Sequence, residues 1–577
     1  MQSLLSYSDL IKMYSEQNLD QLNFNSKVLI VSDFETTQFS KALQAYLISK
    51  HLKIEVHNSK YNTVFQTLLD KNLTKEFNYV LLMFSPQHFK QAFYTSGFTA
   101  KEKLDEISSI LHHVQKQGKT ILLTTMPLVN EQVWGNRSRN VELAVNYQIE
   151  LFNKLILDLA ENNKEINIID LAFTASQIGL NNWYSPGLWY QAKYVCHPRY
   201  YPNICQAIAR NLEATSGRVF KCIVLDLDNT LWGGVIGDDG INGIKLGPEG
   251  EGAIYSDIQR YFLQLKKAGY LLALASKNYE DIALEAINNH PNMVLKSEDF
   301  VCYKINWNNK AENIQAISQE LNLGLNSFLF IDDNPMEREL VKTSLPEVTV
   351  PNLPEDPTEY INYINQLFLF ENISFTKEDQ LRNNLYKTEI KRNSVKSSFS
   401  NLDEFLESLQ MSALIYPVNP TNIDRAEQLI QRSNQFNLRT QRLNCAELSK
   451  RTKDSNFINF CVKLEDKFGD LGIIAVVSCA VNHEEIFIDE FVMSCRVLQR
   501  GVEELIFNYL IQKSIERNIK LIRGGYIKSE KNILVKDLYH KFNFKKLNTK
   551  DQETNWILDT TKSEKFKHYI KTEVKDE

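Results

Sequence analysis

Two carboxylates and a hydroxyl follow a short apolar run in the middle of the chain. The run KCIVLDLDNTLWGG (221–234) places Asp226 and Asp228 directly after a predicted buried strand, with Thr230 two residues further on. Ionised carboxylates at the end of a buried strand are unfavourable unless a cation or a ligand compensates them. The pattern therefore indicates a site for a metal ion or a phosphorylated ligand.

Three later segments carry polar residues at the same kind of position. In ALASKN (273–278), Ser276 lies at the end of a predicted strand. In FIDDNP (330–335), Asp332 and Asp333 lie at the end of another, and Lys310 opens a predicted helix. Because catalytic groups in open α/β sheets gather at the carboxyl ends of the strands, these side chains are expected to lie beside the first two carboxylates. Lys304 is an alternative to Lys310, which fits the start of a helix better.

The elements that must position these groups alternate between strands and helices. Alternation of this kind predicts parallel sheets covered on both faces, followed near the C-terminus by an antiparallel α+β region. Predicted strands cover 28–34, 79–86, 119–127, 165–173, 221–228, 270–277, 327–334, 456–466, 470–482 and 485–495, and predicted helices cover 101–117, 140–161, 254–268, 280–288, 310–321, 375–395, 501–516 and 530–541.

Composition favours a multidomain protein that does not bind nucleic acid. The 577 residues exceed what one hydrophobic core holds, and 65 Lys and Arg against 71 Asp and Glu give a net charge of −6, with no basic excess. The eight cysteines form no Cys-x-x-Cys pair, which argues against a structural zinc site or a thioredoxin-like motif. Few cysteines in so large a protein fit a reducing compartment. No secretory signal and no membrane-spanning run is visible, so we expect a cytoplasmic protein with no membrane contact and a frayed charged tail at 571–577.

The four segments, in their order and strand context, resemble the four motifs of the haloacid-dehalogenase (HAD) phosphatase superfamily over residues 220–360. The resemblance implies that Asp226 attacks phosphorus to form an aspartyl phosphate, while Asp228 acts as general acid and then general base. It also implies that Ser276 and Lys310 hold the phosphoryl oxygens, with Thr230 among the catalytic groups.

The same resemblance implies a Mg²⁺ site. Asp226, the backbone carbonyl of Asp228 and Asp332 would bind the ion, with Asp333 in support, because Mg²⁺ prefers hard oxygen ligands. The gaps between the motifs hold no sizeable cap domain, and only residues 232–250 could form a small flap. An uncapped site can admit a group carried on a protein, or it can be closed by another part of the chain.

The residues within and around these motifs indicate one family within the superfamily. LDLDNTLWGGVIGDDG, FIDDNPMERE, RSNQFNLRTQR (432–442) and SCRVLQRGVEE (494–504) resemble the FkbH-like family over nearly the whole chain. The resemblance implies an α/β multidomain protein with three parts. These are an SGNH-hydrolase-like three-layer α/β domain (1–215), a capless Rossmann-like HAD core (216–370) and an α+β acyltransferase-like (GNAT) domain (371–577).

The resemblance also implies a reaction. Family members in polyketide biosynthesis take the glyceryl group of 1,3-bisphosphoglycerate, remove phosphate and pass a glyceryl thioester to an acyl carrier protein. We therefore expect Mg²⁺ and either acyl-CoA or carrier phosphopantetheine as cofactors, with a carrier protein and a phosphorylated small molecule as partners. One alternative is a bifunctional HAD phosphatase and acyl-CoA-dependent N- or O-acyltransferase of a surface-polysaccharide or secondary-metabolite pathway. Another is that the flanking domains are binding modules only.

In a GNAT domain, the turn that begins at Arg496 would bind the CoA pyrophosphate through a helix N-terminus. Gln499 replaces the first glycine of the family turn, which favours carrier pantetheine over CoA. Arg496, Arg500 and Gly501 are predicted to contact the acyl carrier. Cys495 precedes them, and a helix N-terminus with two arginines would favour its thiolate, so it is a candidate acyl thioester. An ordinary buried cysteine is the alternative.

Further candidates lie on both sides of this turn. Asn434, Gln435 and Asn437 form an amide cluster that could bind pantetheine or a glyceryl group, with a capped turn as the alternative. Tyr539 falls where such domains often place a general acid, next to His540, and ordinary helix packing is the alternative for both, favoured for His540. A basic patch for an acidic carrier is predicted from Arg432, Arg439, Arg442, Arg496 and Arg500.

The N-terminal region carries a weaker signal. Ser32 and Asp33 lie at the end of the first predicted strand, in the reverse of the Asp-Ser order of an SGNH nucleophile. Asn136 and the pair Asp170 and His197 fill the later SGNH blocks only loosely. We therefore expect the N-terminal region to be a docking or scaffolding domain. It is also a candidate for the part of the chain that closes the HAD site.

Overall fold

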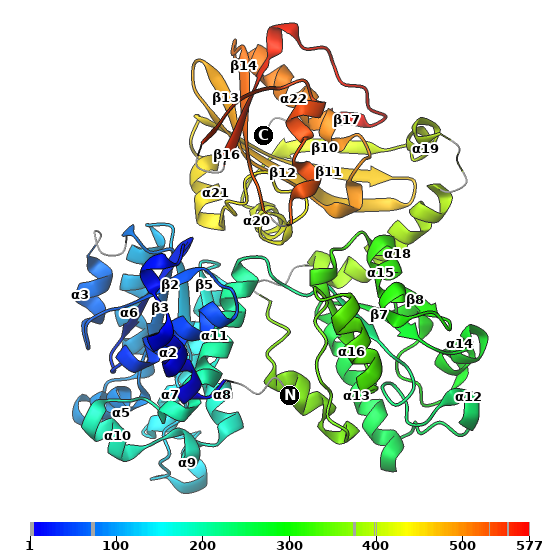
Figure 1. The fold of residues 1–577 in the computed structure, drawn as a ribbon. Coiled ribbons are helices and arrows are strands. Elements are labelled where there is room, and N and C mark those ends of the chain that lie inside the picture. Colours follow the sequence, from blue (N-terminus) through cyan, green and yellow to red (C-terminus); the bar gives the residue numbers. More distant parts are fainter. Residues whose placement is uncertain are drawn as a thin grey trace. The chain divides into compact units, whose positions relative to one another are not determined.

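The computed structural model describes residues 5–70, 75–372, 377–396, 399, 401–529, 531–550 and 553–575 (Figure 1). The chain divides into two compact units. The first is Met1–Ser216 with Asn444–Ala446, and the second is Gly217–Leu443 with Glu447–Glu577. Among the helices of the described residues, none is long and apolar enough to cross a membrane.

The first unit contains a five-stranded parallel sheet of order β2-β1-β3-β4-β5. Its strands are β1 (Ser26–Ser32), β2 (Ile54–Asn58), β3 (Tyr79–Met83), β4 (Thr120–Thr124) and β5 (Ile166–Ile169). Its helices are α1 (Tyr7–Glu16), α2 (Thr37–Ser49), α3 (Val64–Leu69), α5 (Pro86–Ser96), α6 (Ala100–Gln115), α7 (Val145–Glu161), α8 (Leu171–Ile178), α9 (Leu180–Trp183), α10 (Pro186–Ala192) and α11 (Tyr201–Thr215).

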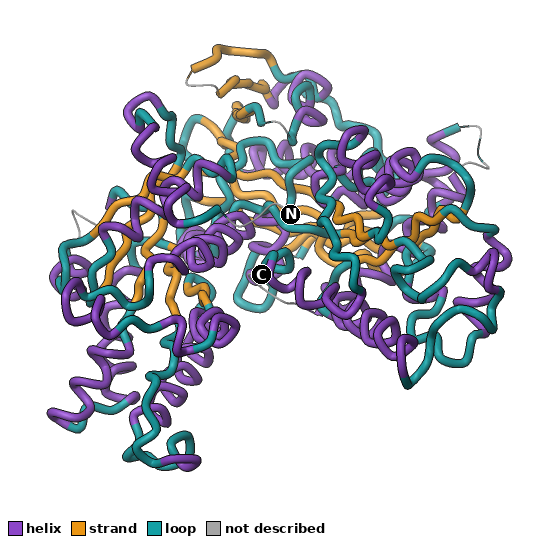
Figure 2. The backbone as a smooth tube through the Cα atoms, turned by 60° about the horizontal axis from the view of Figure 1, so that its bottom comes forward, coloured by secondary structure: helices purple, strands orange, loops and turns teal. Residues whose placement is uncertain are grey.

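Helices cover both faces of this sheet (Figure 2). Strands β1, β3 and β4 each hold at least four consecutive buried residues, which is typical of strands that are covered on two sides. The sequence pattern missed β2, because its short run IEVHN is mostly half-buried and carries three polar side chains at the edge of the sheet.

The second unit contains a four-stranded parallel sheet of order β8-β7-β6-β9. Its strands are β6 (Cys222–Leu225), β7 (Leu271–Ser276), β8 (Cys302–Ile305) and β9 (Phe328–Ile331). The associated helices are α12 (Ile236–Asp239), α13 (Gly250–Lys267), α14 (Glu280–Asn289), α15 (Lys310–Leu321), α16 (Pro335–Ser344) and α17 (Tyr360–Gln366). The edge strand β8 was not predicted, because only its first and last residues are buried.

Alternate residues of these strands enter two different cores. Ile223 and Leu225 of β6 pack in one core, while Cys222 and Val224 pack in the core on the other face. Strands β7 and β9 divide in the same way. This two-residue period fixes the register of the sheet. The parallel pairing of β6 with β7 and β9 brings their carboxyl ends to one edge.

The second unit also holds an eight-stranded mixed sheet of order β15-β16-β14-β13-β12-β11-β10-β17. Its strands are β10 (Ser412–Pro417), β11 (Phe457–Asp466), β12 (Gly469–Val481), β13 (Glu485–Met493), β14 (Leu521–Ile527), β15 (Lys545–Lys550), β16 (Glu553–Asp559) and β17 (Lys571–Val574). The helices are α18 (Lys377–Lys396), α19 (Leu402–Ser408), α20 (Ile423–Arg432), α21 (Cys445–Thr452), α22 (Val502–Glu516) and α23 (Leu538–Lys541). Of the tail expected to fray, residues 571–574 instead pair as β17 with β10, and residues 576–577 lie outside the described residues.

Strands β13 and β14 pair in parallel only over their first four residues and then separate. The inserted segment, Phe436–Leu438, fills the gap between them. Met493 N–H donates to the carbonyl of Phe436 at 3.2 Å, and Leu438 N–H donates to Phe491 at 3.4 Å on the β13 side. On the β14 side, Ile527 N–H donates to Leu438 at 2.9 Å. The chain itself thus satisfies backbone groups that the separation of the strands would leave unpaired.

A buried ion cluster joins α18 to the mixed sheet. Arg392 forms a two-pronged pair with Asp466, whose oxygens lie 2.6 and 2.8 Å from its nitrogens, and it also contacts Glu389. Arg500 pairs with Glu389 and lies 3.6 Å from Asp466. Removing one partner from such a cluster leaves a buried charge uncompensated. The mixed α/β architecture with parallel sheets agrees with the expected fold class, while the division at residues 370 and 371 falls inside the second unit and stays a prediction.

Candidate active site

The described structure brings the predicted phosphoryl-transfer residues together at the carboxyl edge of the four-stranded sheet. Asp226 follows β6, Ser276 ends β7, and Asp332 follows β9. Lys310 opens α15, and its Nζ lies 3.0 Å from Asp226 Oδ1 and 2.6 Å from Asp332 Oδ2. Lys304, the alternative, pairs instead with Glu320 near the C-terminal end of α15.

Three carboxylates form a cluster that suits a divalent cation. One oxygen each of Asp226, Asp332 and Asp333 lies within 4.8 Å of the others. Burial raises the pKa of Asp332, and the charge of Asp226 raises it further. Burial and Asp226 likewise raise the pKa of Asp333 to about 6. Asp226 Oδ1 is buried and accepts no well-directed hydrogen bond among the described residues. Hard oxygen donors that repel one another in a buried site fit Mg²⁺.

The carboxylate of Asp228 is held apart from this cluster. Its Oδ1 accepts hydrogen bonds from Trp232 Nε1 at 2.8 Å and from Ile236 N–H at 3.1 Å, and its Oδ2 accepts one from Asn278 Nδ2 at 3.0 Å. Burial raises the pKa of Asp228, although these hydrogen bonds lower it. A carboxyl group with a raised pKa, next to a second carboxylate, suits general acid–base chemistry. The side chain of Asp228 therefore lies outside the cluster of Asp226, Asp332 and Asp333. The metal contact predicted for Asp228 was through its backbone carbonyl, and that contact stays a prediction.

Thr230 and Asn278 connect the motifs. Thr230 Oγ1 donates to Asp333 Oδ1 at 3.3 Å and accepts from the Asp333 N–H at 3.2 Å. Asn278 Nδ2 donates to both Asp228 and Ser276 Oγ, the latter at 3.1 Å. Asn278 was not predicted, although its position two residues after Ser276 places it on the same loop.

Arg338 was also missed by the sequence reading. It lies in α16, and its Nη1 donates to the backbone carbonyls of Asp332 and Asp333, at 2.8 Å in the case of Asp332. This contact anchors the loop that carries two of the three clustered carboxylates. Arg338 is 8% exposed. The sequence signal for this contact was that Arg338 follows Asp333 by five residues.

Mg²⁺ is expected to raise the thermal unfolding midpoint, and to raise it more at about pH 8 than at about pH 5.5. Raised pKa values for Asp332 and Asp333 mean that the folded state holds these protons more tightly than the unfolded state. Folding stability is therefore lost as the pH rises from the unfolded pKa through the folded one, and a cation offsets that loss. At about 100 times its Kd, Mg²⁺ would contribute about 2.7 kcal/mol. Differential scanning fluorimetry with and without Mg²⁺ measures this, and equal shifts at both pH values would contradict it.

Comparison with known proteins supports the same assignment. The model of the FkbH N-terminal domain matches residues 27–211. The crystal structure of the N-terminal part of the protein BF1531 from Bacteroides fragilis, which contains a phosphatase domain complexed with Mg, is 30% identical. The match covers 64% of this chain and 100% of that chain at a TM-score of 0.60. The chain belongs to the FkbH-like family. It is an enzyme with a HAD phosphatase-like domain.

Two further solved structures are only distantly similar to this FkbH-like chain. The ribosomal-protein-S18-alanine N-acetyltransferase from Escherichia coli is 14% identical at a TM-score of 0.20, over 25% of this chain and 90% of that chain. N-acetyltransferase PseH from Campylobacter jejuni, in complex with acetyl coenzyme A, is 19% identical at a TM-score of 0.16, over 19% of this chain and 74% of that chain. These two likenesses indicate no activity for the FkbH-like chain. No curated protein matches its sequence.

Tyr539 of the FkbH-like chain is a core residue, which favours helix packing over its predicted role as a general acid. Its side chain is fully buried and its Oη has no hydrogen-bond partner among the described residues. Burial raises its pKa well above the usual value. Its ring packs on Phe544 at 5.0 Å and lies so close to Gly524 that a Cβ there would be 2.3 Å from Oη. His540 beside it is exposed.

Tyr539→Phe is expected to change the free energy of unfolding by less than about 1 kcal/mol, because the hydroxyl makes no hydrogen bond. Tyr539→Ala is expected to cost about 3–5 kcal/mol through the cavity it leaves. Urea unfolding of both variants, followed by acyl-transfer assays, separates packing from proton transfer. A Phe variant that is stable but inactive would restore the catalytic role.

The predicted turn before α22 does not form a pyrophosphate cradle with free arginines. Arg500 is held in the buried ion cluster, and Arg496 donates to Ser494 Oγ and to the Leu471 carbonyl. Gly501 is the left-handed residue before α22, with φ +84°. Cys495 lies in a short turn that ends at residue 497, whereas α22 begins at residue 502, so the expected placement at that helix N-terminus is wrong.

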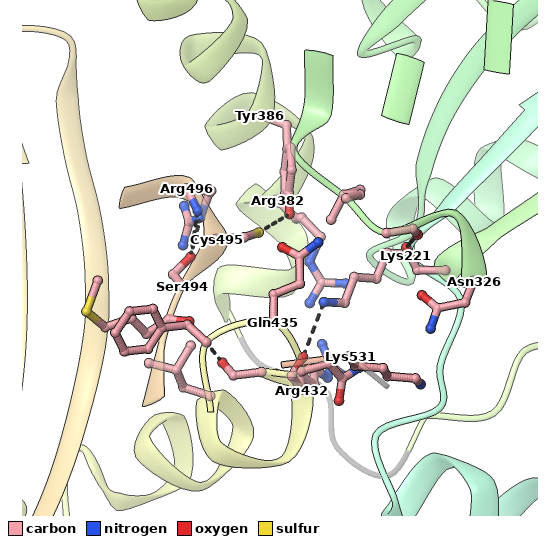
Figure 3. A pocket seen from close by; sticks show the side chains of 18 of the residues that line it. Lys221, Asn326, Arg382, Tyr386, Arg432, Gln435, Ser494, Cys495, Arg496 and Lys531 are labelled. Carbon is pink, nitrogen blue, oxygen red and sulfur yellow. Dashed lines mark hydrogen bonds between the residues drawn. The ribbon is translucent and has the colours of Figure 1, made fainter. Parts of the chain in front are cut away.

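The amide cluster is divided between two environments. Asn437 is fully buried in the inserted segment, where its Oδ1 accepts from Thr440 N–H at 2.7 Å, as in a capped turn. Asn434 and Gln435 line a cavity that Cys495 and Arg496 also line (Figure 3). Of the predicted basic patch, Arg432 and Arg496 line this cavity. Arg439 pairs with Asp489 and Glu553, and Arg442 donates to Asn434 and to the carbonyls of residues 430 and 431.

In the first unit, the loosely matched SGNH residues have local partners. Asp170 caps α8 and accepts from Thr125 Oγ1 at 2.8 Å, while His197 caps a short turn and contacts Arg199. Ser32 donates to the carbonyl of Phe34. Asn136 lies in a short turn over residues 135–137. These contacts account for the residues structurally, and the SGNH-like and scaffolding expectations stay predictions.

Proposed function

We propose that this FkbH-like protein is a Mg²⁺-dependent phosphatase and acyltransferase that dephosphorylates a glyceryl group derived from 1,3-bisphosphoglycerate and loads it onto the thiol of an acyl carrier protein. The observation that carries the proposal is the buried set of Asp226, Asp332, Asp333 and Lys310, with Asp228 held separately beside it. This set provides a nucleophile, a counter-charge for phosphoryl oxygens and an acid–base group within one edge of a sheet.

Each protein group has a step in this proposal. The carboxylate of Asp226 attacks phosphorus, the phosphorus–oxygen bond to the leaving group breaks, and Asp228 protonates the leaving oxygen. Asp228 then takes a proton from water as the water oxygen attacks phosphorus, the bond between phosphorus and the Asp226 carboxylate breaks, and phosphate leaves. Lys310 and Ser276 bind the phosphoryl oxygens, and the ammonium charge of Lys310 is secured because Asp226 and Asp332 raise its pKa despite burial.

Asp226, Asp332 and Asp333 would hold Mg²⁺. The ion would neutralise negative charge on the phosphoryl group and on the three carboxylates. In the relative from Bacteroides fragilis, the phosphatase domain is complexed with Mg, which supports the choice of ion.

Acyl transfer would use the thiol of a carrier protein rather than that of CoA. A thiolate attacks the acyl carbon of the acyl phosphate, the carbon–oxygen bond breaks, and phosphate leaves. Phe436–Leu438 already occupies the gap between β13 and β14. A pantetheine arm that bound there as an added strand, whether from CoA or from a carrier protein, would have to displace hydrogen bonds to both strands. This segment therefore does not separate the two donors, and the acyl-CoA-dependent acyltransferase stays the alternative.

Intact mass spectrometry tests the proposal directly. The full-length protein is incubated with Mg²⁺, 1,3-bisphosphoglycerate and a holo carrier protein, and the expected result is a carrier that gains the mass of one glyceryl group, together with released phosphate. An apo carrier without its prosthetic thiol is the control and should gain nothing. Phosphate release without any gain on a range of carriers would reduce the proposal to a phosphatase, and transfer from acyl-CoA in place of the acyl phosphate would favour the alternative.

A further inference from the structure

A cavity of about 260 Å³ lies in the second unit, away from the carboxylate cluster (Figure 3). Its walls come from the start of β6, the loop before β9, helices α18 and α20, and the segments around residues 435 and 495. Lys221 and Asn326 represent the HAD-like part of the wall, while Arg432 and Cys495 represent the mixed-sheet part.

Positive charge dominates the wall. Among the described residues that line the cavity, the only carboxylate is Glu347, whereas six are cationic: Lys221, Arg382, Arg425, Arg432, Arg496 and Lys531. Burial lowers the pKa of Lys221, and the guanidinium groups of Arg382 and Arg432 lower it further. Cations that oppose one another's charge around a cavity are relieved by an anion.

Arg496 gives an independent sign of a ligand. Its side chain is only 7% exposed, and its Nη1 has no hydrogen-bond partner among the described residues. The other side-chain nitrogens are engaged, since Nε donates to Ser494 Oγ at 3.2 Å and Nη2 to the Leu471 carbonyl at 3.4 Å. A buried guanidinium N–H without an acceptor is costly unless a ligand supplies one.

The rest of the wall suits an uncharged chain. Phe436, Met493 and Leu429 contribute buried apolar surface, and the amide of Gln435 lies in the middle of the view in Figure 3. The Cys495 thiol lies 3.7 Å from the hydroxyl of Tyr386 on the same wall. A ligand with a phosphate at one end and an amide-containing chain would match both parts of the cavity.

The cavity lies at the amino ends of the strands of the four-stranded sheet, and the carboxylate cluster lies at their carboxyl ends. Lys221 directly precedes β6 and Asp226 directly follows it, which separates their backbones by about 16 Å at about 3.3 Å per residue. The loop at residues 323–327, which also lines the cavity, precedes β9, whereas Asp332 follows it. One phosphate group cannot contact both sets of residues.

We propose that this cavity is a second anion site, which binds the phosphate ester of a ligand that carries an uncharged chain, with Lys221, Arg432 and Arg496 as phosphate-binding residues. The phosphopantetheine arm of a carrier protein has this chemistry, and naming it as the ligand rests on the proposed function. A free phosphorylated metabolite is the other source of the same group.

Isothermal titration calorimetry on the full-length protein in EDTA tests the site. The probes are 4′-phosphopantetheine, pantetheine, inorganic phosphate and 3-phosphoglycerate. We expect 4′-phosphopantetheine to bind at least about ten times more tightly than pantetheine, and inorganic phosphate to compete with it. Lys221→Gln and Arg432→Gln should each weaken binding at least about tenfold, and Lys221→Arg should retain it. Arg260→Gln, which changes an exposed arginine of α13, is the matched control.

The outcomes separate the sources and the two proposals. Competition by 3-phosphoglycerate at the affinity of 4′-phosphopantetheine would assign the site to a free metabolite, and tighter binding of the arm would assign it to a carrier. Equal binding of pantetheine and its phosphate ester, or unchanged binding in both glutamine variants, would overturn the site. Thermal unfolding without ligand identifies a variant that fails to fold. Phosphopantetheine binding without carrier loading would refute the proposed function and leave the anion site intact.

Discussion

Asp226→Asn is expected to reduce phosphate release by a factor of about 10³ or more while leaving the protein folded. The amide cannot attack phosphorus, so no aspartyl phosphate forms. The same change removes a charge that raises the pKa values of Asp332 and Asp333, so the folded state loses repulsion. Activity and stability should therefore move in opposite directions, with activity lost and the free energy of unfolding unchanged or increased in the absence of Mg²⁺.

A phosphate-release assay with several phosphate esters, together with urea unfolding in EDTA, measures both effects. The matched control is Asp257→Asn, which makes the same chemical change at an exposed position of α13 in the same unit. We expect the control to keep its activity. Turnover of Asp226→Asn within about tenfold of the parent protein would remove Asp226 as the nucleophile.

Lys310→Met is expected to lower the free energy of unfolding by about 3–5 kcal/mol, because methionine keeps the length of the side chain but leaves two buried carboxylates without a counter-ion. Lys310 is 4% exposed, and its Nζ contacts Asp226 and Asp332 within 3.0 Å. The variant should also lose phosphate release, because no ammonium group then faces the phosphoryl oxygens.

Lys304→Met provides the comparison within the same segment of chain. Lys304 forms an ion pair with Glu320 in which about a quarter to a third of each side chain is exposed, so its loss should cost no more than about 1 kcal/mol. Denaturant unfolding in EDTA compares the two variants. Equal destabilisation by the two substitutions would contradict the buried counter-ion role, and loss of activity in Lys304→Met alone would reverse the assignment of the motif.

Much of the phosphoryl-transfer site could be predicted because its residues lie at strand ends. Asp226, Ser276 and Asp332 each close a buried apolar run, and parallel pairing brings such ends to one edge. Asn278 and Arg338 escaped prediction because each acts by hydrogen bonds to a neighbouring loop. Strand periodicity carries no signal for such contacts.

The mixed-sheet region was harder to predict because its polar residues depend on partners far along the chain. Arg500 looks like a free cation next to a helix, yet its partner Glu389 lies 111 residues earlier in the sequence. Tyr539 looks like an acid near a site, but the missing side chain of Gly524 lets its ring enter the core. Strands β2, β8 and β17 were missed for another reason, since edge strands are partly exposed and lack a long apolar run.

The carboxylate cluster and the basic cavity lie at opposite ends of the strands of one sheet. This separation limits how a reaction intermediate can move from one site to the other. On the proposed function, an acyl phosphate bound at the carboxylate cluster would not pass to a thiol at the cavity by a rotation of side chains. It would either cross bulk solvent, where it is exposed to hydrolysis, or travel on a covalent tether. A pulse–chase experiment distinguishes these routes, because a released intermediate exchanges with an unlabelled pool, whereas a tethered one retains its label through to product.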